Sequence, residues 1–359
     1  MFKVLIFSKL FKIGGGGHPQ ALHAMSHSMK KKIIFDVYHD DGFSINIGSK
    51  FNLNNILAKD KKKLKLNSYN AFIICGSWQI KILYFLIIAK LKKRKIIYMP
   101  KGNLSLYEFY SYRGLLKLPV LFTVEIIKIL LSDLIIYTSE LEKKYSFSNS
   151  FISKKYLILP DYYKLVKKKL RSNHKEKKIF NIGFIAQYSK RKSLIECIDS
   201  FELLCNSHPK KKFFFYIAGT PVKKNSKYYN DIIKRICLSK YNNKIFILGH
   251  LDGLDKRLFY KKMNLILYPS KYESFGLIAL EGIEYGCNIL TTFFIGALEN
   301  ITSKNIYKIR KINKENITKG IQYFLKNPHY NEFKKTIKKI NHLIYSRKDE
   351  LYKYIINEL

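Results

Sequence analysis

Glu273 and Glu281 are the two residues of this sequence that most clearly suggest chemistry. They lie eight residues apart, around an expected junction between a loop and a helix. The first N–H groups of a helix have no partner within it and carry the positive end of its dipole, so they bind anions. Carboxylates accept hydrogen bonds from hydroxyl groups. We therefore expect this junction to hold a phosphate group, with a carboxylate on either side.

Two elements must form for the glutamates to be placed in this way. Leu265–Tyr268 is an apolar run of strand type, and Pro269 ends it because proline cannot donate to a sheet ladder. Ser274 is expected to cap a short helix, which would end at Gly286. One glutamate would thus lie before this helix and the other inside it.

The first turn of the expected helix contains Phe275 and Gly276. Gly276 has no side chain that would keep a phosphate away from the N–H groups. Because a helix rises about 1.5 Å per residue, Glu281 would lie roughly 7 Å along the axis from Gly276, so that Glu273 and Glu281 could flank a diphosphate. A diphosphate between two rings rich in hydroxyl groups is a nucleotide sugar, and the pattern indicates this ligand.

The same block resembles the E-x7-E signature of the retaining glycosyltransferases of the group 1 type, which have the GT-B fold. In that family a strand ends in P-S, the signature reads E-x-F-G-x-x-x-x-E-x-x-x-x-G, and a strand and a G-x-x-E turn follow. This sequence matches in order at Pro269, Ser270, Glu273, Phe275, Gly276, Glu281, Gly286, the strand Asn288–Thr292, Gly296 and Glu299. The alternative, one exposed and one capping carboxylate without a binding role, stays open.

The resemblance implies a role for each residue of the block. Glu273 would hold hydroxyl groups of the donor sugar, and Glu281 would hold the ribose hydroxyls. Lys192 and the N–H groups of the loop would neutralise the leaving diphosphate, which is the main catalytic contribution in such a scheme. The expected catalytic residues are therefore Glu273 and Lys192, and the expected donor-binding loop consists of Ser274, Phe275, Gly276 and Leu277.

Lys192 belongs to a second motif, residues 183–193 (GFIAQYSKRKS), which resembles the family's G-F-x-G-R-L-x-x-x-K-G loop. Gln187 stands where the family has a donor-binding arginine, and the flanking glycine positions hold Ala186 and Ser193. A neutral amide can bind a phosphate oxygen but cannot offset its charge. Either Lys190 or Arg191 compensates, or donor binding is weaker. The alternative for Lys192 is a solvated loop lysine.

Two weaker matches lie in the N-terminal half. Four glycines, of which Gly15 and Gly16 are the central pair, form a loop that the resemblance places opposite the diphosphate, with a merely flexible loop as the alternative. Residues 98–105 (YMPKGNLS) resemble the family's P-H-G loop near the donor sugar, with Lys101 in place of histidine. Lysine brings a charge that neutral histidine lacks. Residues 138–142 (TSELE) resemble a T-S-x-x-E turn with a structural role.

No metal site or cofactor is expected. His23 and His27 lie four residues apart without a third ligand in view, and no Asp-x-Asp pair stands out. The five cysteines form no C-x-x-C pair, which argues against a zinc site and favours buried thiols. The cations that neutralise a diphosphate would therefore have to come from the protein.

The elements that position these motifs repeat in both halves of the chain. A chain of 359 residues with 47% apolar composition can form two cores. Apolar runs alternate with amphipathic segments, which is typical of parallel sheets covered by helices. The expected strands are Phe2–Phe7, Ile33–Tyr38, Ala71–Cys75, Lys95–Met99, Leu134–Thr138, Phe180–Ala186, Lys212–Ala218, Lys244–Leu248, Leu265–Tyr268 and Asn288–Leu290.

The fold class that this order predicts is α/β, with two doubly wound Rossmann-like domains that face a central cleft, as in the GT-B type. Residues 1–170 would form an N-terminal domain on the acceptor side, and residues 178–340 would form the domain that binds the donor. The polar stretch 167–178 is the expected linker. Residues 341–359 would form a helix that crosses back to the N-terminal domain.

The charge is strongly basic, with 66 Lys and Arg against 26 Asp and Glu and a formal net charge of +40. Such a charge suits a polyanion or an anionic membrane surface, although a solvated surface explains any single cluster equally well. Signatures of specific nucleic-acid recognition are absent from the sequence. The N-terminal apolar run is too short for a signal peptide, and the apolar windows are too short for a bilayer span. We expect a cytoplasmic protein, peripheral on the cytoplasmic face of the membrane.

The leading hypothesis is a metal-independent retaining glycosyltransferase that moves a hexosyl or related sugar from a nucleotide diphosphate sugar to a hydroxyl acceptor. The acceptor would be a growing surface glycan or a lipid-linked saccharide. Two alternatives stay open. One is a non-catalytic protein of the GT-B fold that binds a donor or a partner, as Gln187 and Lys101 suggest. The other is a basic protein associated with a membrane or with nucleic acid.

Overall fold

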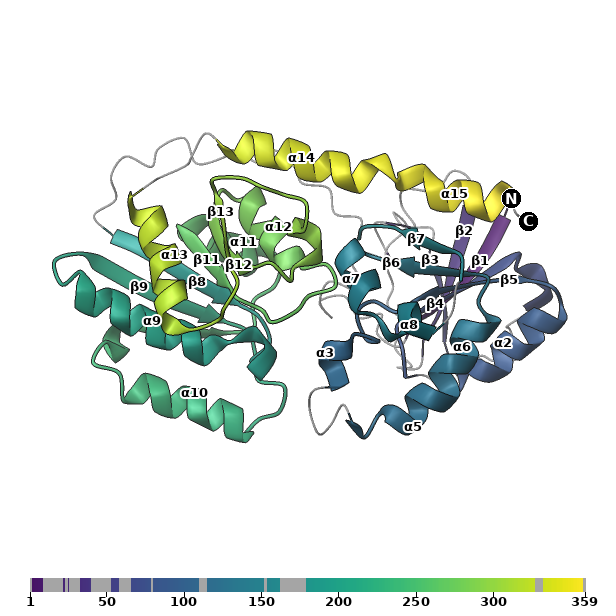
Figure 1. Ribbon diagram of the computed structural model, residues 1–359, viewed down its shortest axis with the longest axis horizontal. Coiled ribbons are helices and arrows are strands. Elements are labelled where there is room, and N and C mark those ends of the chain that lie inside the picture. Colours follow the sequence, from purple (N-terminus) through teal and green to yellow (C-terminus); the bar gives the residue numbers. More distant parts are fainter. Residues whose placement is uncertain are drawn as a thin grey trace. The chain divides into compact units, whose positions relative to one another are not determined.

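The computed structural model describes residues 2–8, 22, 25, 33–39, 53–57, 66–78, 80–109, 115–151, 154–161, 179–326 and 332–357. The chain divides into two compact units. Unit 1 comprises Met1–Tyr163 and His342–Leu359, and unit 2 comprises Lys164–Asn341. Each unit contains its own parallel β-sheet with helices packed on it (Figure 1). The predicted α/β class with two doubly wound sheets is confirmed.

The sheet of unit 1 has the strand order β3-β2-β1-β4-β5-β6-β7, and all neighbouring strands run parallel. Its central strands are apolar along their length because helices cover both faces of such a sheet. The strands are β1 Phe2–Ser8, β2 Ile33–His39, β3 Leu53–Leu57, β4 Ala71–Cys75, β5 Lys95–Met99, β6 Leu134–Tyr137 and β7 Tyr156–Ile158.

Two apolar layers cover the faces of this sheet. On one face, Leu351 and Ile355 of the C-terminal helix pack against the strands, and on the other, Leu86 and Ile129 do so. The helical segments of this unit are η2 Leu66–Ser68, α2 Ile82–Leu91, α3 Leu106–Phe109, α5 Leu118–Val120, a π-helical turn η3 Leu121–Glu125, α6 Ile126–Leu131, α7 Glu140–Tyr145, α8 Phe147–Phe151 and α15 Lys348–Asn357.

The sheet of unit 2 has six parallel strands in the order β10-β9-β8-β11-β12-β13. Its strands are β8 Ile179–Ile185, β9 Lys212–Ala218, β10 Ile245–Gly249, β11 Leu265–Tyr268, β12 Asn288–Thr292 and β13 Ile306–Ile309. Its helical segments are η4 Lys190–Lys192, α9 Leu194–Ser207, α10 Lys227–Cys237, η5 Asn242–Lys244, α11 Gly253–Lys262, α12 Leu277–Glu284, η6 Gly296–Leu298, α13 Lys314–Lys326 and α14 Phe333–Ser346, of which α14 continues past the unit boundary.

The parallel order brings the loops after β8, β11 and β12 to one edge of the sheet in unit 2. These loops carry the two motifs that the sequence singles out. Among the described residues, no helix combines the length and the apolar character needed to cross a membrane. The cysteines are free thiols, and all are buried except Cys237, whose exposure at the end of α10 differs from the expectation.

Candidate functional site

The loop before α12 differs from the sequence prediction in one respect. The helix begins at Leu277, and Gly276 is its N-cap in the left-handed conformation, with φ of 100° and ψ of 58°. No side chain caps the helix, so the expected capping role of Ser274 is wrong. Phe275 and Gly276 precede the helix and do not form its first turn. The N–H of Ala279 donates to the carbonyl of Gly276 at 3.2 Å, which leaves the N–H groups of Leu277 and Ile278 without a partner within the helix and without a capping side chain.

The reason for this later start is a backbone pairing with the loop after β12. The N–H of Glu273 donates to the carbonyl of Phe294 at 2.9 Å, and the N–H of Gly296 donates to the carbonyl of Glu273 at 3.1 Å. The N–H of Ala297 donates to the carbonyl of Phe275 at 2.7 Å. These bonds keep residues 273–275 extended, so these residues cannot adopt the helical conformation. They also explain the G-x-x-E turn, which supports the loop of the first glutamate.

Gly276 is required by its surroundings. A Cβ atom at this position would lie 2.6 Å from Cγ2 of Ile295, and its positive φ is a conformation that other residues rarely adopt. At the other end of α12, Gly286 has φ of 77°, and its N–H donates to the carbonyl of Ile283 at 3.0 Å. This geometry confirms the predicted glycine that ends the helix.

Lys192 and Glu273 form an ion pair at this edge of the sheet. Nζ of Lys192 contacts Oε1 of Glu273, and the two side chains are only 9% and 13% exposed. Burial, opposed by the charge of Glu273, holds the pKa of Lys192 below its ordinary value. Burial raises the pKa of Glu273, but the charges of Lys192 and Arg191 outweigh burial and hold this pKa below its ordinary value. Each charge of the pair thus favours the ionised form of the other.

Arg191 adds a second positive charge to the pair. Its Nη1 donates to the carbonyl of Tyr272 at 3.4 Å, and its own carbonyl accepts from the N–H of Lys271 at 2.9 Å. Its charge acts on the pKa of both Lys192 and Glu273. Gln187 and Lys190, in contrast, are exposed on the same loop. Of the two cations that could replace the missing arginine, Arg191 is the one whose charge acts on the pair.

Glu281 is held by two side chains of α11 that the sequence analysis did not identify. Nζ of Lys256 donates to Oε1 of Glu281 at 2.7 Å, and the hydroxyl of Tyr260 donates to Oε2 at 2.7 Å. Glu281 is only 7% exposed. Lys256 and Tyr260 are four residues apart, so they lie on one face of α11. The spacing of Lys256 and Tyr260 is visible in the sequence, but it does not show that both contact Glu281.

Tyr268, at the end of β11, is close to both glutamates. Burial, and then the charge of Glu273, raise the pKa of Tyr268 well above its ordinary value, and Glu281 adds to the effect. Nζ of Lys192 lies 5.1 Å from the centre of its ring. The site in unit 2 thus contains two carboxylates, three cations (Lys192, Arg191 and Lys256) and an open helix start around one tyrosine. This arrangement can bind an anion beside groups that accept hydrogen bonds from hydroxyls.

Lys101 lies in unit 1, after β5, and is buried with a partner of its own. Its Nζ contacts Oδ1 of Asp161, and the side chains are 4% and 10% exposed. Burial lowers the pKa of Lys101, but the charge of Asp161 and weaker negative groups outweigh burial and raise this pKa above its ordinary value. Glu142 behind them accepts from the N–H and the hydroxyl of Thr138, both at 2.6 Å. The charge that replaces histidine is therefore neutralised within unit 1.

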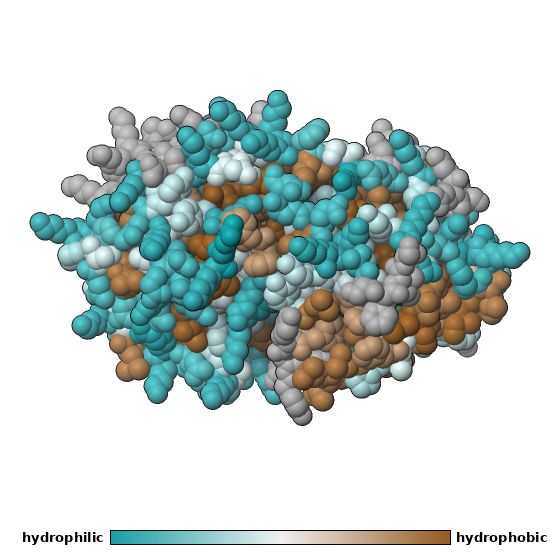
Figure 2. All heavy atoms as spheres, in the orientation of Figure 1, coloured by the Kyte–Doolittle hydropathy of each residue, from teal (hydrophilic) through white to brown (hydrophobic). Residues whose placement is uncertain are grey.

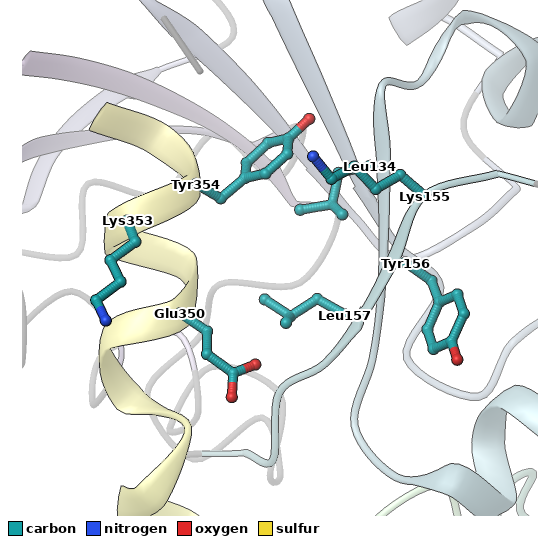
Figure 3. A pocket seen from close by; sticks show the side chains of 7 residues that line it. All are labelled: Leu134, Lys155, Tyr156, Leu157, Glu350, Lys353 and Tyr354. Atoms are coloured by element: carbon teal, nitrogen blue, oxygen red, sulfur yellow. The ribbon is translucent and has the colours of Figure 1, made fainter. Parts of the chain in front are cut away.

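Some of the predicted features fall outside the described residues. These are Gly15, Gly16 and the linker 167–178. In the described part of the chain, no cluster of three or more His, Cys, Asp or Glu residues could hold a metal ion. A cavity of about 310 Å³ lies between α15 and the edge of the sheet, lined among others by Lys155, Leu157 and Tyr354 (Figure 3). None of the predicted site residues lines it.

Residues 165–340 match the family described as "Glycosyl transferases group 1". This half of the chain belongs to the group 1 glycosyl transferases. A poly(glycerol-phosphate) alpha-glucosyltransferase of Bacillus subtilis is 27% identical over 144 residues, which is 40% of this chain and 20% of that protein. An uncharacterized protein in the cps region of Klebsiella pneumoniae is 25% identical over 239 residues, which is 64% of this chain and 62% of that protein. The chain thus spans less than two thirds of either relative.

Solved structures show the same fold at low sequence identity. HepE of Anabaena, in complex with UDP, has a TM-score of 0.76 and 13% identity, with 100% of both chains covered. The same protein in complex with UDP-glucose has a TM-score of 0.75, again at 13% identity and with 100% of both chains covered. The fold of the chain is therefore of the GT-B type, with two doubly wound parallel sheets.

Proposed function

We propose that the chain is a retaining glycosyltransferase that moves a sugar from a nucleotide diphosphate sugar to a hydroxyl acceptor. The observation that carries this proposal is the buried pair of Lys192 and Glu273 beside the uncapped start of α12. It combines an anion-binding helix start, a cation and a carboxylate at one edge of the sheet. Family membership of residues 165–340 supports the same conclusion.

Lys192 and the N–H groups at the start of α12 stabilise the leaving nucleoside diphosphate. Because Lys192 is buried and its pKa is already lowered, a negatively charged diphosphate that approaches it regains the electrostatic stabilisation that burial removes. Arg191 adds a second charge next to the pair. Preorganised charges in a site that excludes water contribute strongly to catalysis. Protein cations perform here the role that a metal ion has in other transferases.

The two glutamates bind hydroxyl groups at the two ends of the donor. Glu273 accepts from the sugar, and Glu281 accepts from the ribose. The contacts of Glu281 with Lys256 and Tyr260 leave lone pairs on both carboxylate oxygens, since each oxygen accepts two hydrogen bonds. Tyr260 and Lys256 are positioning residues in this scheme, because they fix the carboxylate before the donor arrives.

The acceptor that we propose is a growing surface glycan or a lipid-linked saccharide, reached from the cytoplasmic face of the membrane. The Bacillus relative is named for a poly(glycerol-phosphate) acceptor, and the Klebsiella relative is encoded in a cps region. HepE was solved with UDP-glucose, which supports a hexosyl donor on uridine diphosphate as the first candidate to test.

The direct test is a donor panel of UDP-, GDP- and dTDP-sugars, with calorimetry for binding and nucleotide release for turnover. We expect one donor to bind and to be turned over slowly by water when no acceptor is present. Glu281→Ala should lower turnover by about a hundredfold, because loss of the ribose contact lets the donor shift away from its reactive position. Glu315→Ala, which changes an exposed glutamate at the start of α13, is the matched control and should keep full turnover.

Several outcomes would contradict the proposal. Wild-type turnover by Glu281→Ala would exclude the scheme, and a product with inverted configuration, seen by NMR of the anomeric proton, would exclude retention. Binding of a donor without turnover would favour the second candidate, a donor-binding protein that is not an enzyme. The observation in favour of that candidate is Lys101, whose ion pair with Asp161 replaces the neutral histidine of the family loop.

A further inference from the structure

Unit 1 has an apolar face that the described residues of its fold leave exposed. It is formed by α2 with its flanking residues and by the segment from Leu115 to α6, which pack against each other. Figure 2 shows apolar residues gathered over α2, α5 and α6. We call this surface the α2–α6 face. Its members are at least 39% exposed and comprise Ile80, Tyr84, Ile87, Leu91, Leu115, Leu116, Phe122, Ile127 and Leu130.

The face is unusual because α2 is apolar on all its sides. From Ile82 to Ala89 the helix contains no charged residue, although Tyr84 and Ile87 are 66% and 49% exposed. A helix of a globular protein normally turns a polar side to water, and one that is apolar all round is buried in a core or in lipid. Contiguous exposed apolar surface of this kind marks an interaction site.

In the segment from Leu115 to α6, the side chains of Glu125 and Lys128 are buried, whereas a helix exposed to water would normally turn its charged side chains outward. Glu125 and Lys128, its only charged residues besides Lys117, are 0% exposed and form an ion pair at 2.7 Å. The hydroxyl of Tyr98 and the N–H of Trp78 complete the hydrogen bonds of this carboxylate. Burial of a charged pair is costly, and water is available on the opposite side of the same helix. The segment is therefore inverted, with charges inside and Phe122, Ile127 and Leu130 outside.

The charge around the α2–α6 face indicates what covers it. Residues 80–94 contain no acidic residue, and the only one in residues 115–131 is the buried Glu125. Lys81 and the run Lys90–Lys95 stand at the two ends of α2, and Lys81, Lys92 and Lys93 are exposed. Lysines whose apolar stems lie along the boundary can place their charges at lipid phosphates. Asp133, two residues after α6, pairs with Lys90 at 2.6 Å, so Lys81, Lys92 and Lys93 carry the excess charge. An apolar centre with excess cations at its edge matches an anionic bilayer.

We infer that the α2–α6 face docks unit 1 onto an anionic lipid surface, with its apolar side chains among the acyl chains and the lysines of α2 at the headgroups. The inference deepens the proposed function, on which its biological meaning rests, because a lipid-linked acceptor lies at such a surface. The binding itself requires no donor and no catalysis. The alternative is that a second copy of the chain covers this face, and light scattering distinguishes the two possibilities.

The test is flotation of the full-length protein with vesicles of phosphatidylglycerol and phosphatidylcholine in equal parts, against vesicles of phosphatidylcholine alone. The first variant changes Leu91, Leu116 and Leu130 to serine. Its matched control changes Leu238, Leu254 and Leu258, three leucines of unit 2 with similar exposure, to serine. If each leucine contributes about fivefold, the factor for about 1 kcal/mol, the first variant should lose roughly a hundredfold in partition. The control should bind like the wild type.

A second pair of variants tests the charge. Lys92→Gln with Lys93→Gln should lower partition onto anionic vesicles by roughly twenty-five-fold, at about fivefold per lysine near the surface. Lys210→Gln with Lys211→Gln removes the same charge from exposed positions of unit 2 and should leave partition unchanged. Equal partition of all variants, or no binding of the wild type to anionic vesicles, would overturn the inference.

Two further readouts keep the outcomes distinct. If light scattering shows a dimer of the wild type that the triple leucine variant dissociates, a second copy covers the face and the lipid inference is wrong. Nucleotide release with a soluble donor, measured without vesicles, reports the proposed function separately. Vesicle binding without turnover of any donor would leave the docking face intact and reject the transferase. Turnover without vesicle binding would support the transferase and reject the docking face.

Discussion

The two units each bury a lysine against a carboxylate at the carboxyl edge of a parallel sheet, but the electrostatic balance differs. In unit 2, Arg191 stands beside the pair of Lys192 and Glu273, and the pKa of Lys192 is lowered, chiefly by burial. In unit 1, Glu142 adds negative charge near the pair of Lys101 and Asp161, and, against the effect of burial, chiefly the charge of Asp161 raises the pKa of Lys101. Positive charge is therefore in excess at the pair in unit 2, whereas the pair in unit 1 is balanced by negative charge. The comparison favours unit 2 as the part that binds the diphosphate.

The largest effect should follow from breaking the pair in unit 2. Lys192→Met leaves Glu273 buried without its partner, which should lower the free energy of unfolding by about 3–5 kcal/mol. Loss of a cation at the leaving group should also lower donor turnover by about a hundredfold or more. Urea unfolding and nucleotide release measure the two effects. Lys271→Gln, at an exposed lysine two residues before Glu273, is the control and should change neither.

A double variant separates stability from chemistry at the same place. Lys192→Met combined with Glu273→Leu removes both charges, and replacement of a buried pair by apolar side chains is often neutral for stability. We expect the double variant to regain most of the lost unfolding free energy while turnover stays as low as in Lys192→Met. Recovery of turnover together with stability would show that the pair is only structural.

Breaking the pair in unit 1 should give a different result. Lys101→Met leaves Asp161 buried without its partner and should lower the free energy of unfolding by about 3 kcal/mol. Because the charge of Lys101 is already neutralised within unit 1, we expect the dissociation constant of the free nucleoside diphosphate to stay within about twofold. Calorimetric titration checks this. A tenfold higher dissociation constant of the diphosphate would mean that Lys101 also contacts the donor. The contrast between the two units would then disappear.

The same contrast should be visible in the dependence of stability on pH. The pKa of Glu273 lies below its ordinary value of 4.5, so its contribution to stability is present above that value and is lost as the pH falls through the folded pKa. The pKa of Lys101 lies above its ordinary value of 10.5, so its contribution is present below that value and is lost as the pH rises through the folded pKa.

The measurement is the difference in unfolding free energy between the wild type and a variant across pH. For Glu273→Gln the difference should narrow toward zero as the pH falls below 4.5. For Lys101→Met it should narrow as the pH rises above 10.5. Differences that do not change with pH would show that the variants act through packing and not through charge.

The strands that the sequence analysis missed have one property in common. β3 and β7 are the two edges of the sheet in unit 1, and β13 is an edge of the sheet in unit 2. β3 contains two asparagines, β7 has only three residues, and β13 contains a lysine. Central strands are buried on both faces and must be apolar, which makes them visible in a sequence, whereas edge strands are under less constraint.

The site was predictable where the information is local and unpredictable where it depends on distant contacts. The glycine that ends α12 and the lysine of η4 follow from spacing along the chain. The partners of the charged groups do not, because Asp161, Lys256 and Tyr260 are at least 21 residues from the groups they contact. The late start of α12 has the same cause, since a pairing with residues 294–297 determines it.

The smallest expected effect on stability comes from the left-handed backbone conformation found at, or directly after, the lysine of each pair. Lys101 itself has φ of 55°, and Ser193, which follows Lys192, has φ of 57°. In the left-handed region a side chain costs about 1–2 kcal/mol, and Ser193 is fully buried. Ser193→Gly should relieve this cost, partly offset by the greater freedom of glycine in the unfolded chain, for a net gain of about 0.5–1 kcal/mol in unfolding free energy.

The change also tests whether the serine serves the site in unit 2. If the backbone alone matters, Ser193→Gly should raise the urea midpoint and leave the dissociation constant of the donor unchanged, because the lysine pair keeps its geometry. Ser193→Ala is the matched control, since it removes the buried, unpartnered hydroxyl but keeps the strained conformation, so the gain of Ser193→Gly over Ser193→Ala measures the backbone effect. Weaker donor binding by both variants would instead assign a donor contact to the hydroxyl of Ser193. In that case Ser193, as well as the charge of Lys192, would distinguish the donor site of unit 2 from the lysine pair of unit 1.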